Sequence, residues 1–187
     1  MLVKNIIKKA SKILGLDNVL DYFETNPETM PDDVSAEIDK LILCINHTNN
    51  TIASIYSEIT ASKNIECTDG IIKFADVSTK DIVDIKNVLE SGGLPQKFKI
   101  MSDGIHTGNG SLIVIYSYLP GDVALYDNID YYTKISEILF SYGVVSEYLF
   151  LSGDINDACL WDKKFKDELF ALSRPRRNIN MPSKRWC

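Results

Sequence analysis

Apolar residues recur every three or four positions over residues 32–61, which is the spacing of one face of an α-helix. The members of this face are Val34, Ile38, Leu41, Ile45, Ile52, Ile55 and Ile59. We therefore expect a long helix, with Asp32, Asp33 or Ser35 supplying its N-terminal cap and a favourable negative charge.

The pattern is interrupted at Thr48, which occupies a place that the rhythm reserves for an apolar residue and lies among His47, Asn49 and Asn50. A polar group in an apolar face costs stability unless it finds hydrogen-bond partners. Three interpretations of this polar band stay open: a contact with another subunit, a bend in the helix, or a buried patch whose groups are hydrogen-bonded.

Two further helical patterns follow near the C-terminus, over residues 131–151 and 155–172. Their apolar faces consist of Ile135, Ile138, Leu139, Tyr142, Val145 and Leu149, and of Ala158, Trp161, Phe165, Leu169 and Leu172. Gly153 favours the left-handed conformation that ends a helix, and Asp154 can cap the next one. These signals predict a helical hairpin in which Trp161 belongs to the core rather than to an interface.

Between residues 65 and 119 the helical spacing gives way to short strand-like runs at 70–74, 82–89, 98–101 and 111–119. Glycine-rich turn signals divide them, so we expect a small antiparallel sheet inserted between helices. The run 82–89 also fits a helix. We interpret the glycine-rich segment 104–110 as a hairpin loop, because no Lys-Ser/Thr pair follows where a phosphate-binding loop requires one.

The N-terminal residues 2–14 predict a short helix that Gly15 ends, and residues 17–24 predict a further turn or two. The lysines of the first helix would suit a membrane surface, but no large aromatic residue anchors its apolar side. We favour a packed helix with a solvated lysine face. The chain has no apolar run long enough to span a membrane and no recognisable secretory signal.

Together these patterns predict a mainly helical α+β fold. We expect a single helical domain over residues 1–172, with a β insertion at 65–119, followed by an extended basic C-terminal arm at 173–187. The 187-residue chain is long enough for one sizeable core.

Charge is distributed unevenly along the chain. The net charge is −6 and residues 174–187 contribute +5 with no acidic residue, which leaves −11 for residues 1–173. An acidic body repels a phosphate backbone, so sequence-specific DNA reading by the body is disfavoured.

Candidate chemistry is sparse. His47 and His106 have no neighbouring residues that form a nucleophile motif, and the acidic pairs of the sequence lack the spacing of a calcium loop. The four cysteines have no C-x-x-C spacing, which favours buried or free thiols in a reducing compartment. They are Cys44, Cys67, Cys159 and Cys187. We expect no catalytic activity, no metal site and no cofactor.

The order of these elements resembles the head-to-tail adaptor, or connector, proteins of tailed bacteriophages, which form the ring directly below the portal in the virion neck. One part of the resemblance is the long helix SAEIDKLILCINHTNNTIASIYSEI, which runs into a β insertion whose last strand ends YSYLP. Another is the hairpin ISEILFSYGVVSEYLFLSGDINDACLWDKKFKDELFAL, with an aromatic-bearing helix end, a glycine turn and an Ala before an aromatic in EYLFLSGDINDACLW. The last is the basic terminus MPSKRW, and the likeness covers most of residues 33–186.

This resemblance implies a structural virion protein of the neck, made in the host cytoplasm. It implies a homo-oligomeric ring, commonly of twelve copies, that binds the portal protein on one side and a tail or stopper protein on the other. Duplex DNA would pass through the lumen without sequence-specific binding, which an acidic lumen favours because repulsion prevents sticking. No membrane is involved.

The candidate interaction site is the C-terminal arm. Pro175 and Pro182 prevent it from continuing the preceding helix, and its mixture of basic and apolar side chains suits docking along another chain. The residues expected to dock are Arg174, Arg176, Arg177, Ile179, Met181, Lys184, Arg185 and Trp186. A disordered basic end is the simpler interpretation of the same composition.

Two other functions fit the same sequence. One is a small regulatory or interaction protein that binds a protein partner through its helices and its arm. The other is a nucleic-acid protein that grips phosphates with RPRR and SKRW, although five charges neutralise few phosphates and salt would readily abolish such binding.

Overall fold

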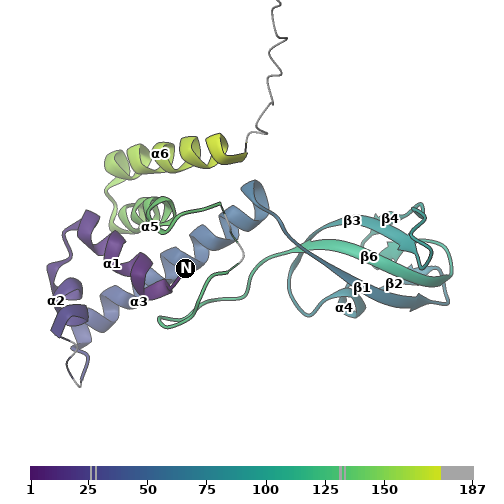
Figure 1. Cartoon of the computed structure of the whole chain (residues 1–187), viewed down its shortest axis with the longest axis horizontal. Helices are drawn as coiled ribbons and strands as arrows, with labels where there is room; N and C mark the ends of the chain where they lie inside the picture. Colours follow the sequence, from purple (N-terminus) through teal and green to yellow (C-terminus); the bar gives the residue numbers. More distant parts are fainter. Residues whose placement is uncertain (26, 28, 131, 133, 174–187) are drawn as a thin grey trace, which may run out of the picture.

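The computed structural model describes residues 1–25, 27, 29–130, 132 and 134–173. Within these residues the protein has six α-helices, one π-helical turn and two three-stranded antiparallel sheets, which confirms the predicted α+β class. Figure 1 shows a helical body from which a β arm, residues 59–118, projects to one side.

Three helices open the chain. Helix α1 is Val3–Leu14, α2 is Asp17–Thr25 and α3 is Asp32–Thr51. Gly15 ends α1 in the left-handed conformation (φ 70°), as its position in the sequence predicts. The cap predicted for α3 is wrong: Pro31 occupies the N-cap position, so Asp32 and Asp33 lie in the first turn and contribute charge only.

The long helix is also shorter than predicted. After Thr51 the chain forms a π-helical turn, η1 (Ile52–Tyr56), and from Ile59 it is a strand rather than the end of a helix. The apolar spacing at Ile55 and Ile59 fits a helix, but pairing with a distant strand decides the conformation of Ile59. Ile55, expected on the buried face, is 68% exposed.

The β arm contains two sheets where one was predicted. The first has the order β1 (Ile59–Cys67), β6 (Gly110–Tyr118), β3 (Ile82–Glu90), and the second has the order β2 (Ile71–Ile72), β5 (Gly104–His106), β4 (Lys99–Met101). The run 82–89 is therefore a strand and not a helix. Part of the segment expected to be a hairpin loop, 104–110, forms β5, and the run 70–74 leads into a short helix, α4 (Phe74–Val77).

The β arm has a small hydrophobic core separate from that of the helical body. It includes Ile72, Ile85, Val88, Ile105 and Val114, which come from both sheets. Strands β1 and β6 pair without a break from Ile59↔Tyr118 to Cys67↔Gly110, so a continuous ribbon links the body to this core.

The predicted helical hairpin is present as α5 (Glu137–Ser152) and α6 (Ile155–Ser173). Helix α5 begins six residues later than expected because Ser136 caps it, accepting a hydrogen bond from the Leu139 backbone N (3.2 Å). Gly153 makes the predicted left-handed turn (φ 85°). Ile45 and Phe165 are buried as expected, whereas Ile138 and Leu172, also assigned to the packed faces, are exposed.

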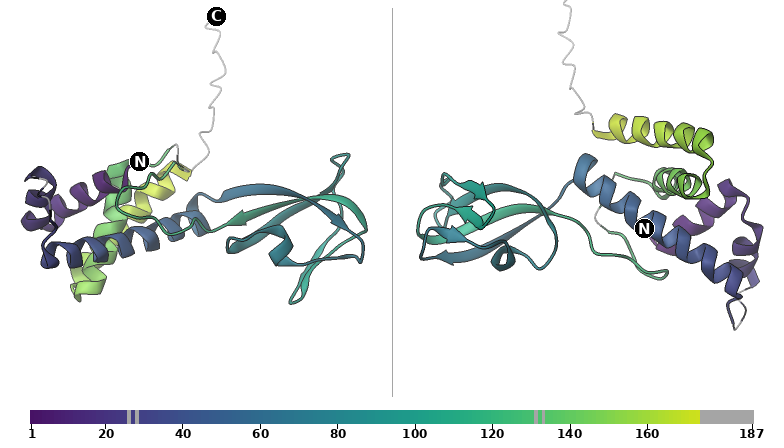
Figure 2. Two further views of the ribbon diagram at one scale, coloured as in Figure 1. Left: turned by 90° about the horizontal axis from the view of Figure 1, so that it is seen from below. Right: turned by 180° about the vertical axis from the view of Figure 1, so that it is seen from behind.

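Helix α5 lies in the middle of the helical body, with α1 and α3 on one side and α6 on the other (Figures 1 and 2). This position explains why its buried residues surround it rather than forming one stripe. Among the described residues no helix is both long and apolar enough to cross a membrane.

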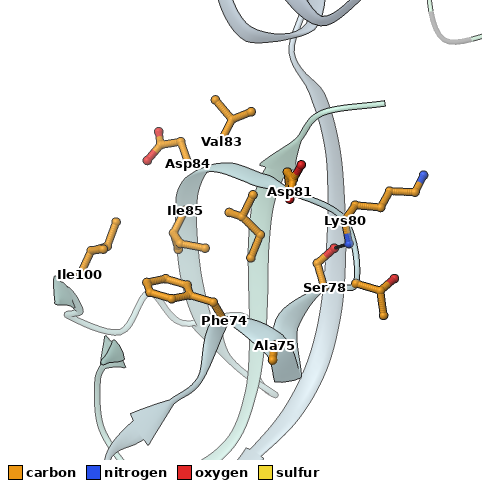
Figure 3. A pocket seen from close by; sticks show the side chains of 11 residues that line it. Phe74, Ala75, Ser78, Lys80, Asp81, Val83, Asp84, Ile85 and Ile100 are labelled. Atoms are coloured by element: carbon orange, nitrogen blue, oxygen red, sulfur yellow. Dashed lines mark hydrogen bonds between the residues drawn. The ribbon is translucent and has the colours of Figure 1, made fainter. Parts of the chain in front are cut away.

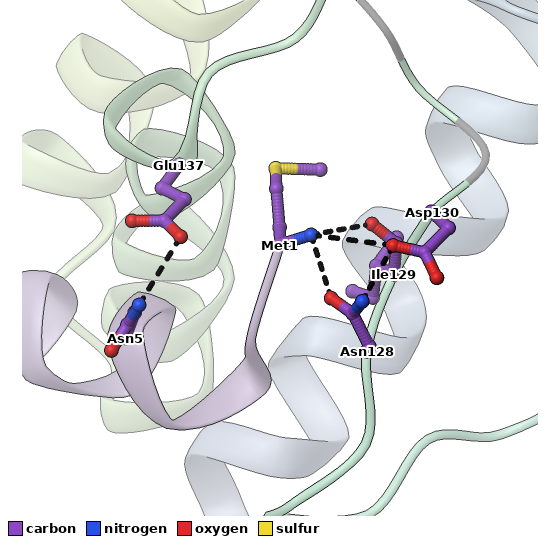
Figure 4. A network of polar contacts seen from close by, with 6 residues as sticks. All are labelled: Met1, Asn5, Asn128, Ile129, Asp130 and Glu137. Carbon is purple, nitrogen blue, oxygen red and sulfur yellow. Dashed lines mark hydrogen bonds and ion pairs between the residues drawn. The ribbon is translucent and has the colours of Figure 1, made fainter.

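The segment that returns from the β arm, residues 119–136, ties the body together. The side chain of Asn46 on α3 accepts from the Val123 backbone N (2.8 Å) and donates to its O (3.4 Å). The terminal amino group of Met1 donates to Asn128 Oδ1 and to the Ile129 carbonyl, both at 2.8 Å, and lies 3.8 Å from Asp130 (Figure 4).

The start of α1 is also tied directly to α5. Asn5 Nδ2 donates to Glu137 Oε1 (3.3 Å), and Lys9 forms an ion pair with the same carboxylate. Lys9 is the main reason that the pKa of Glu137 is lowered.

Candidate protein-interaction surface

The C-terminal arm lies outside the described residues, with all of its candidate contacts: Arg174, Arg176, Arg177, Ile179, Met181, Lys184, Arg185 and Trp186. The structure does define the point from which the arm leaves. Helix α6 ends at Ser173, one residue beyond the predicted end, on the side of the helical body that faces the β arm (Figures 1 and 2).

Helix α6 forms the outermost layer of the helical body, where it packs mainly on α5 and also touches η1 (Figure 1). Its inner side buries Ala158, Phe165 and Leu169. Trp161 is half-buried beside Tyr142, with ring centroids 5.3 Å apart, which fits the core role predicted for it better than an interface role.

The α5–α6 hairpin exposes several large apolar side chains along its two helices. They are Ile138, Phe150, Leu151, Ile155, Leu160, Phe170 and Leu172. Single exposed apolar residues are common on soluble proteins, but their accumulation on one hairpin is typical of a protein-binding surface. The sequence analysis assigned only one apolar face to each helix and missed this surface. Leu160 and Phe170 were the available signal, because both lie off the face that contains Phe165.

Four residues of α6 define what we call the outer stripe: Leu160, Lys163, Asp167 and Phe170. Their spacings of three, four and three place them on one face of the helix, and all four are exposed, Leu160 by 68% and Phe170 by 55%. Apolar side chains thus lie at the two ends of the stripe, with one positive and one negative charge between them.

The charges beside the outer stripe are already engaged within the chain. Lys164 Nζ lies over the rings of Tyr142 (4.0 Å) and Trp161 (4.9 Å), and Lys166 forms an ion pair with Asp162 (2.7 Å). Within the described part of the chain, Lys163 and Asp167 form no ion pair and no side-chain hydrogen bond. The stripe therefore carries one positive and one negative charge that no ion pair within the described residues holds.

The polar band on α3 is buried only in part. His47 is largely exposed, and its Nδ1 lies 2.8 Å from Glu147 Oε2 on α5. Thr48 and Asn49 are buried, yet Thr48 Oγ1 and both side-chain polar atoms of Asn49 have no hydrogen-bond partner among the described residues. The described residues therefore supply no hydrogen bonds to the side chains of Thr48 and Asn49, and a contact with another subunit stays a prediction.

Cys44 lies near this band and is also buried. Burial, followed by the nearby charge of Glu147, raises the pKa of its thiol to about 12. A thiol with so high a pKa stays protonated and is a poor nucleophile, so Cys44 is a packing residue. Cys67 is buried in the β arm and Cys159 is exposed on α6.

The β arm has a hollow of about 460 Å³ beside β3, shown in Figure 3. Phe74, Ile85 and Ile100 supply apolar wall, Asp81 and Asp84 lie at its rim, and the Lys80 side chain extends away from it. Asp84 is held by Lys86, which also binds Glu58, and these two carboxylates raise the pKa of Lys86. Ser78 and Thr79 also line the hollow, and none of its lining residues is a histidine.

The second histidine, His106, contacts a carboxylate. His106 Nε2 lies 2.9 Å from Asp103 Oδ1, and this contact is the main reason that the pKa of Asp103 is lowered. No group of three or more metal-ligating side chains occurs among residues 1–173 as far as they are described.

Comparison with known proteins adds no family, since no family model and no curated protein matches the chain.

Proposed function

We propose that this protein is a structural adaptor of a tailed-bacteriophage neck, which forms a homo-oligomeric ring below the portal and joins it to a tail component. The observation that carries the proposal is the exposed apolar surface of the α5–α6 hairpin, from the end of which the basic arm leaves. A surface of this kind gains free energy by binding protein rather than by transforming a small molecule.

Charge segregation supports a head-to-tail contact between copies. Residues 1–58 and 120–173 contain 19 acidic and 9 basic residues, a net charge of −10, whereas the arm carries +5. Eight acidic residues and no basic one lie between residues 13 and 39, which include α2 and the start of α3. These elements lie at the end of the helical body remote from Ser173 (Figures 1 and 2).

Opposite charges at opposite ends of a subunit favour a heterologous contact, in which the arm of one copy meets the acidic end of the next. Heterologous contacts close into rings when the rotation between subunits allows it. The negative body would also prevent duplex DNA from adhering to the wall of a lumen. The β arm adds exposed apolar residues at its far end, among them Leu94, Ile100 and Met101, which would contact a neighbour or the portal.

The test is removal of the arm. A chain that ends at Ser173 keeps every buried contact described above, so it should fold normally and fail to enter the ring. Trp186→Ala should weaken assembly more than Lys184→Ala, because a buried aromatic residue contributes more than a charge at the rim of an interface. Electron microscopy of the protein, alone and with a portal protein, is the readout. Rings of wild-type stability from the truncated chain would refute the proposal.

The same exposed hairpin supports a second candidate, a small non-enzymatic protein that binds a regulatory partner. Such a protein needs the apolar surface but no closed ring. The two candidates separate in the same microscopy experiment, because a regulatory protein would form no ring either alone or with a portal.

A further inference from the structure

Helix α6 is the outermost layer of the helical body (Figures 1 and 2). The outer stripe lies on the face of this helix opposite its buried residues Ala158, Phe165 and Leu169. Leu160 has more of its surface exposed than most large apolar residues of the chain. Exposing a leucine rather than burying it forgoes the favourable transfer of its side chain out of water. A stripe that ends in Leu160 and Phe170 therefore favours an apolar partner surface of similar length.

The two charges in the stripe restrict what that partner is. Lys163 and Asp167 are one turn apart, carry opposite signs and form no ion pair or side-chain hydrogen bond within the described residues. Lys164 and Lys166 do not compete for a partner, since aromatic rings and Asp162 already hold them. A complementary partner surface has two apolar ends. Between them it has a negative charge opposite Lys163 and a positive charge opposite Asp167.

The outer stripe itself has this arrangement when it is turned end to end. We propose that two copies of the protein pair through their α6 helices, antiparallel about a two-fold axis. In the register that sets Leu160 opposite Phe170 of the second copy, Lys163 lies opposite Asp167 of the second copy, because both pairs share the midpoint of position 165. The symmetry repeats each contact, which gives two apolar contacts and two ion pairs.

The size of this contact sets its strength. Helix α6 has 19 residues and is about 28 Å long, so one face buries less than the roughly 800 Å² per partner of a standard stable interface. We expect a reversible dimer with a dissociation constant on the order of micromolar. Leu160 and Phe170 belong to the hairpin surface on which the proposed function also rests. The pairing uses none of the arm residues, whose removal tests the proposed function, so failure of the pairing and failure of the ring are distinguishable.

Sedimentation velocity of the full chain over a concentration series tests the pairing. The wild type should change from monomer to dimer as its concentration rises. Lys163→Glu places a carboxylate opposite Asp167, and Asp167→Lys places two lysines opposite each other, so each variant alone should weaken the dimer at least about tenfold. Lys97→Glu on the β arm makes the same change in net charge as Lys163→Glu, at an exposed site away from α6, and should leave the dimer unchanged.

Mixing the two single variants gives the decisive result. A Lys163→Glu chain and an Asp167→Lys chain have complementary stripes in the antiparallel register, so the mixture should form a heterodimer of wild-type strength although neither variant dimerises well alone. A defect in folding cannot produce this rescue. Leu160→Ser should weaken every one of these dimers.

Three results would overturn the inference. They are a wild type that stays monomeric at all concentrations, single variants that associate as well as the wild type, and a mixture that associates no better than its components. If Leu160→Ser lowers the thermal midpoint, the charge variants still decide, because Lys163 and Asp167 lie on the surface.

Discussion

Gly143 of α5 lies so close to Thr48 of α3 that a methyl group added at position 143 would stand 2.6 Å from the Cγ2 of Thr48. The same methyl group would stand 2.8 Å from Cζ of Phe165 on α6. Both distances are far below van der Waals contact, so the absence of a side chain at position 143 allows α3 and α6 to approach α5 from two sides.

Gly143→Ala should therefore destabilise the protein, although alanine is intrinsically the better helix former by about 1 kcal/mol. Overpacking costs about 1–3 kcal/mol, and two contacts below 3.0 Å favour the upper part of that range. After the gain in helix propensity we expect a net loss of roughly 1–2 kcal/mol in the free energy of unfolding, measured with urea. Gly92→Ala is the matched control, since a methyl group there meets no atom within 4 Å. Equal stability of Gly143→Ala and the wild type would contradict the close packing of the three helices.

A second prediction concerns the hydroxyl group of Thr48. The group is buried without a hydrogen-bond partner in the described structure, and valine has the same shape without the oxygen. Thr48→Val should raise the free energy of unfolding by about 1 kcal/mol.

The contrasting variant is Ser146→Ala. Ser146 is equally buried, but its Oγ donates to the carbonyl of Ala158 (3.1 Å), so its removal should lower stability by about 1 kcal/mol. If Thr48→Val were also destabilising in urea unfolding, the hydroxyl of Thr48 must have a partner, for which a buried water or a second subunit would account.

The apolar spacing of the sequence predicted most helices but not where they end. The rhythm that begins at Val34 continues through Ile52 and Ile55 to Ile59, and nothing local distinguishes the last of these from a helical residue. Its strand conformation follows from pairing with Tyr118, 59 residues along the chain. The spacing of apolar residues gives no information on contacts between residues so far apart in the chain. For the same reason it could not reveal that the β arm divides into two sheets.

At the candidate site, the sequence predicted the buried residues of α6 but not the exposed apolar ones. Reasoning from apolar faces assumes that such residues point inward, so Phe165 and Leu169 were placed correctly while the exposure of Leu160 and Phe170 was missed. Both residues fall outside the predicted face of α6, and a second apolar direction on one helix indicates a second contact. The docking role of the arm rests on its composition and stays a prediction.

Alanine substitutions at the two phenylalanines of α6 compare a buried side chain, Phe165, with an exposed one, Phe170. Phe165 is almost completely buried between helices, so Phe165→Ala should cost roughly 2–5 kcal/mol, and we expect a similar cost for Ile45→Ala. Phe170→Ala should cost less than about 1 kcal/mol, because more than half of that side chain is exposed. Thermal or urea unfolding of the three variants provides the comparison, and equal losses at positions 165 and 170 would mean that α6 is rotated from the orientation described.

The last prediction concerns the hydrogen bond that joins α5 to α3. Tyr148 donates its hydroxyl hydrogen to Glu37 Oε2 (2.6 Å), and this bond, helped by Lys40, lowers the pKa of Glu37 below its ordinary value of 4.5. Burial, and then the Glu37 carboxylate, raises the pKa of Tyr148 to about 12 from 10.0. The interaction between a neutral phenol and a charged carboxylate contributes to both shifts, as the largest cause for Glu37 and the second, after burial, for Tyr148.

A depressed carboxyl pKa contributes stability above pH 4.5 that is lost as the pH falls through the folded value. A raised phenol pKa contributes stability below pH 10 that is lost as the pH rises towards about 12. Tyr148→Phe removes the contribution of the phenol and the part of the Glu37 contribution that this hydrogen bond supplies, whereas Lys40 remains. It should therefore cost about 1 kcal/mol near neutral pH and progressively less outside either limit, when urea unfolding is followed across pH.

Tyr142→Phe on the same helix is the control for this series, since within the described residues its hydroxyl makes no hydrogen bond. It should change stability little and equally at every pH. A constant difference between Tyr148→Phe and the wild type from acid to alkali would show that the Tyr148 hydroxyl does not discriminate between charged and neutral Glu37.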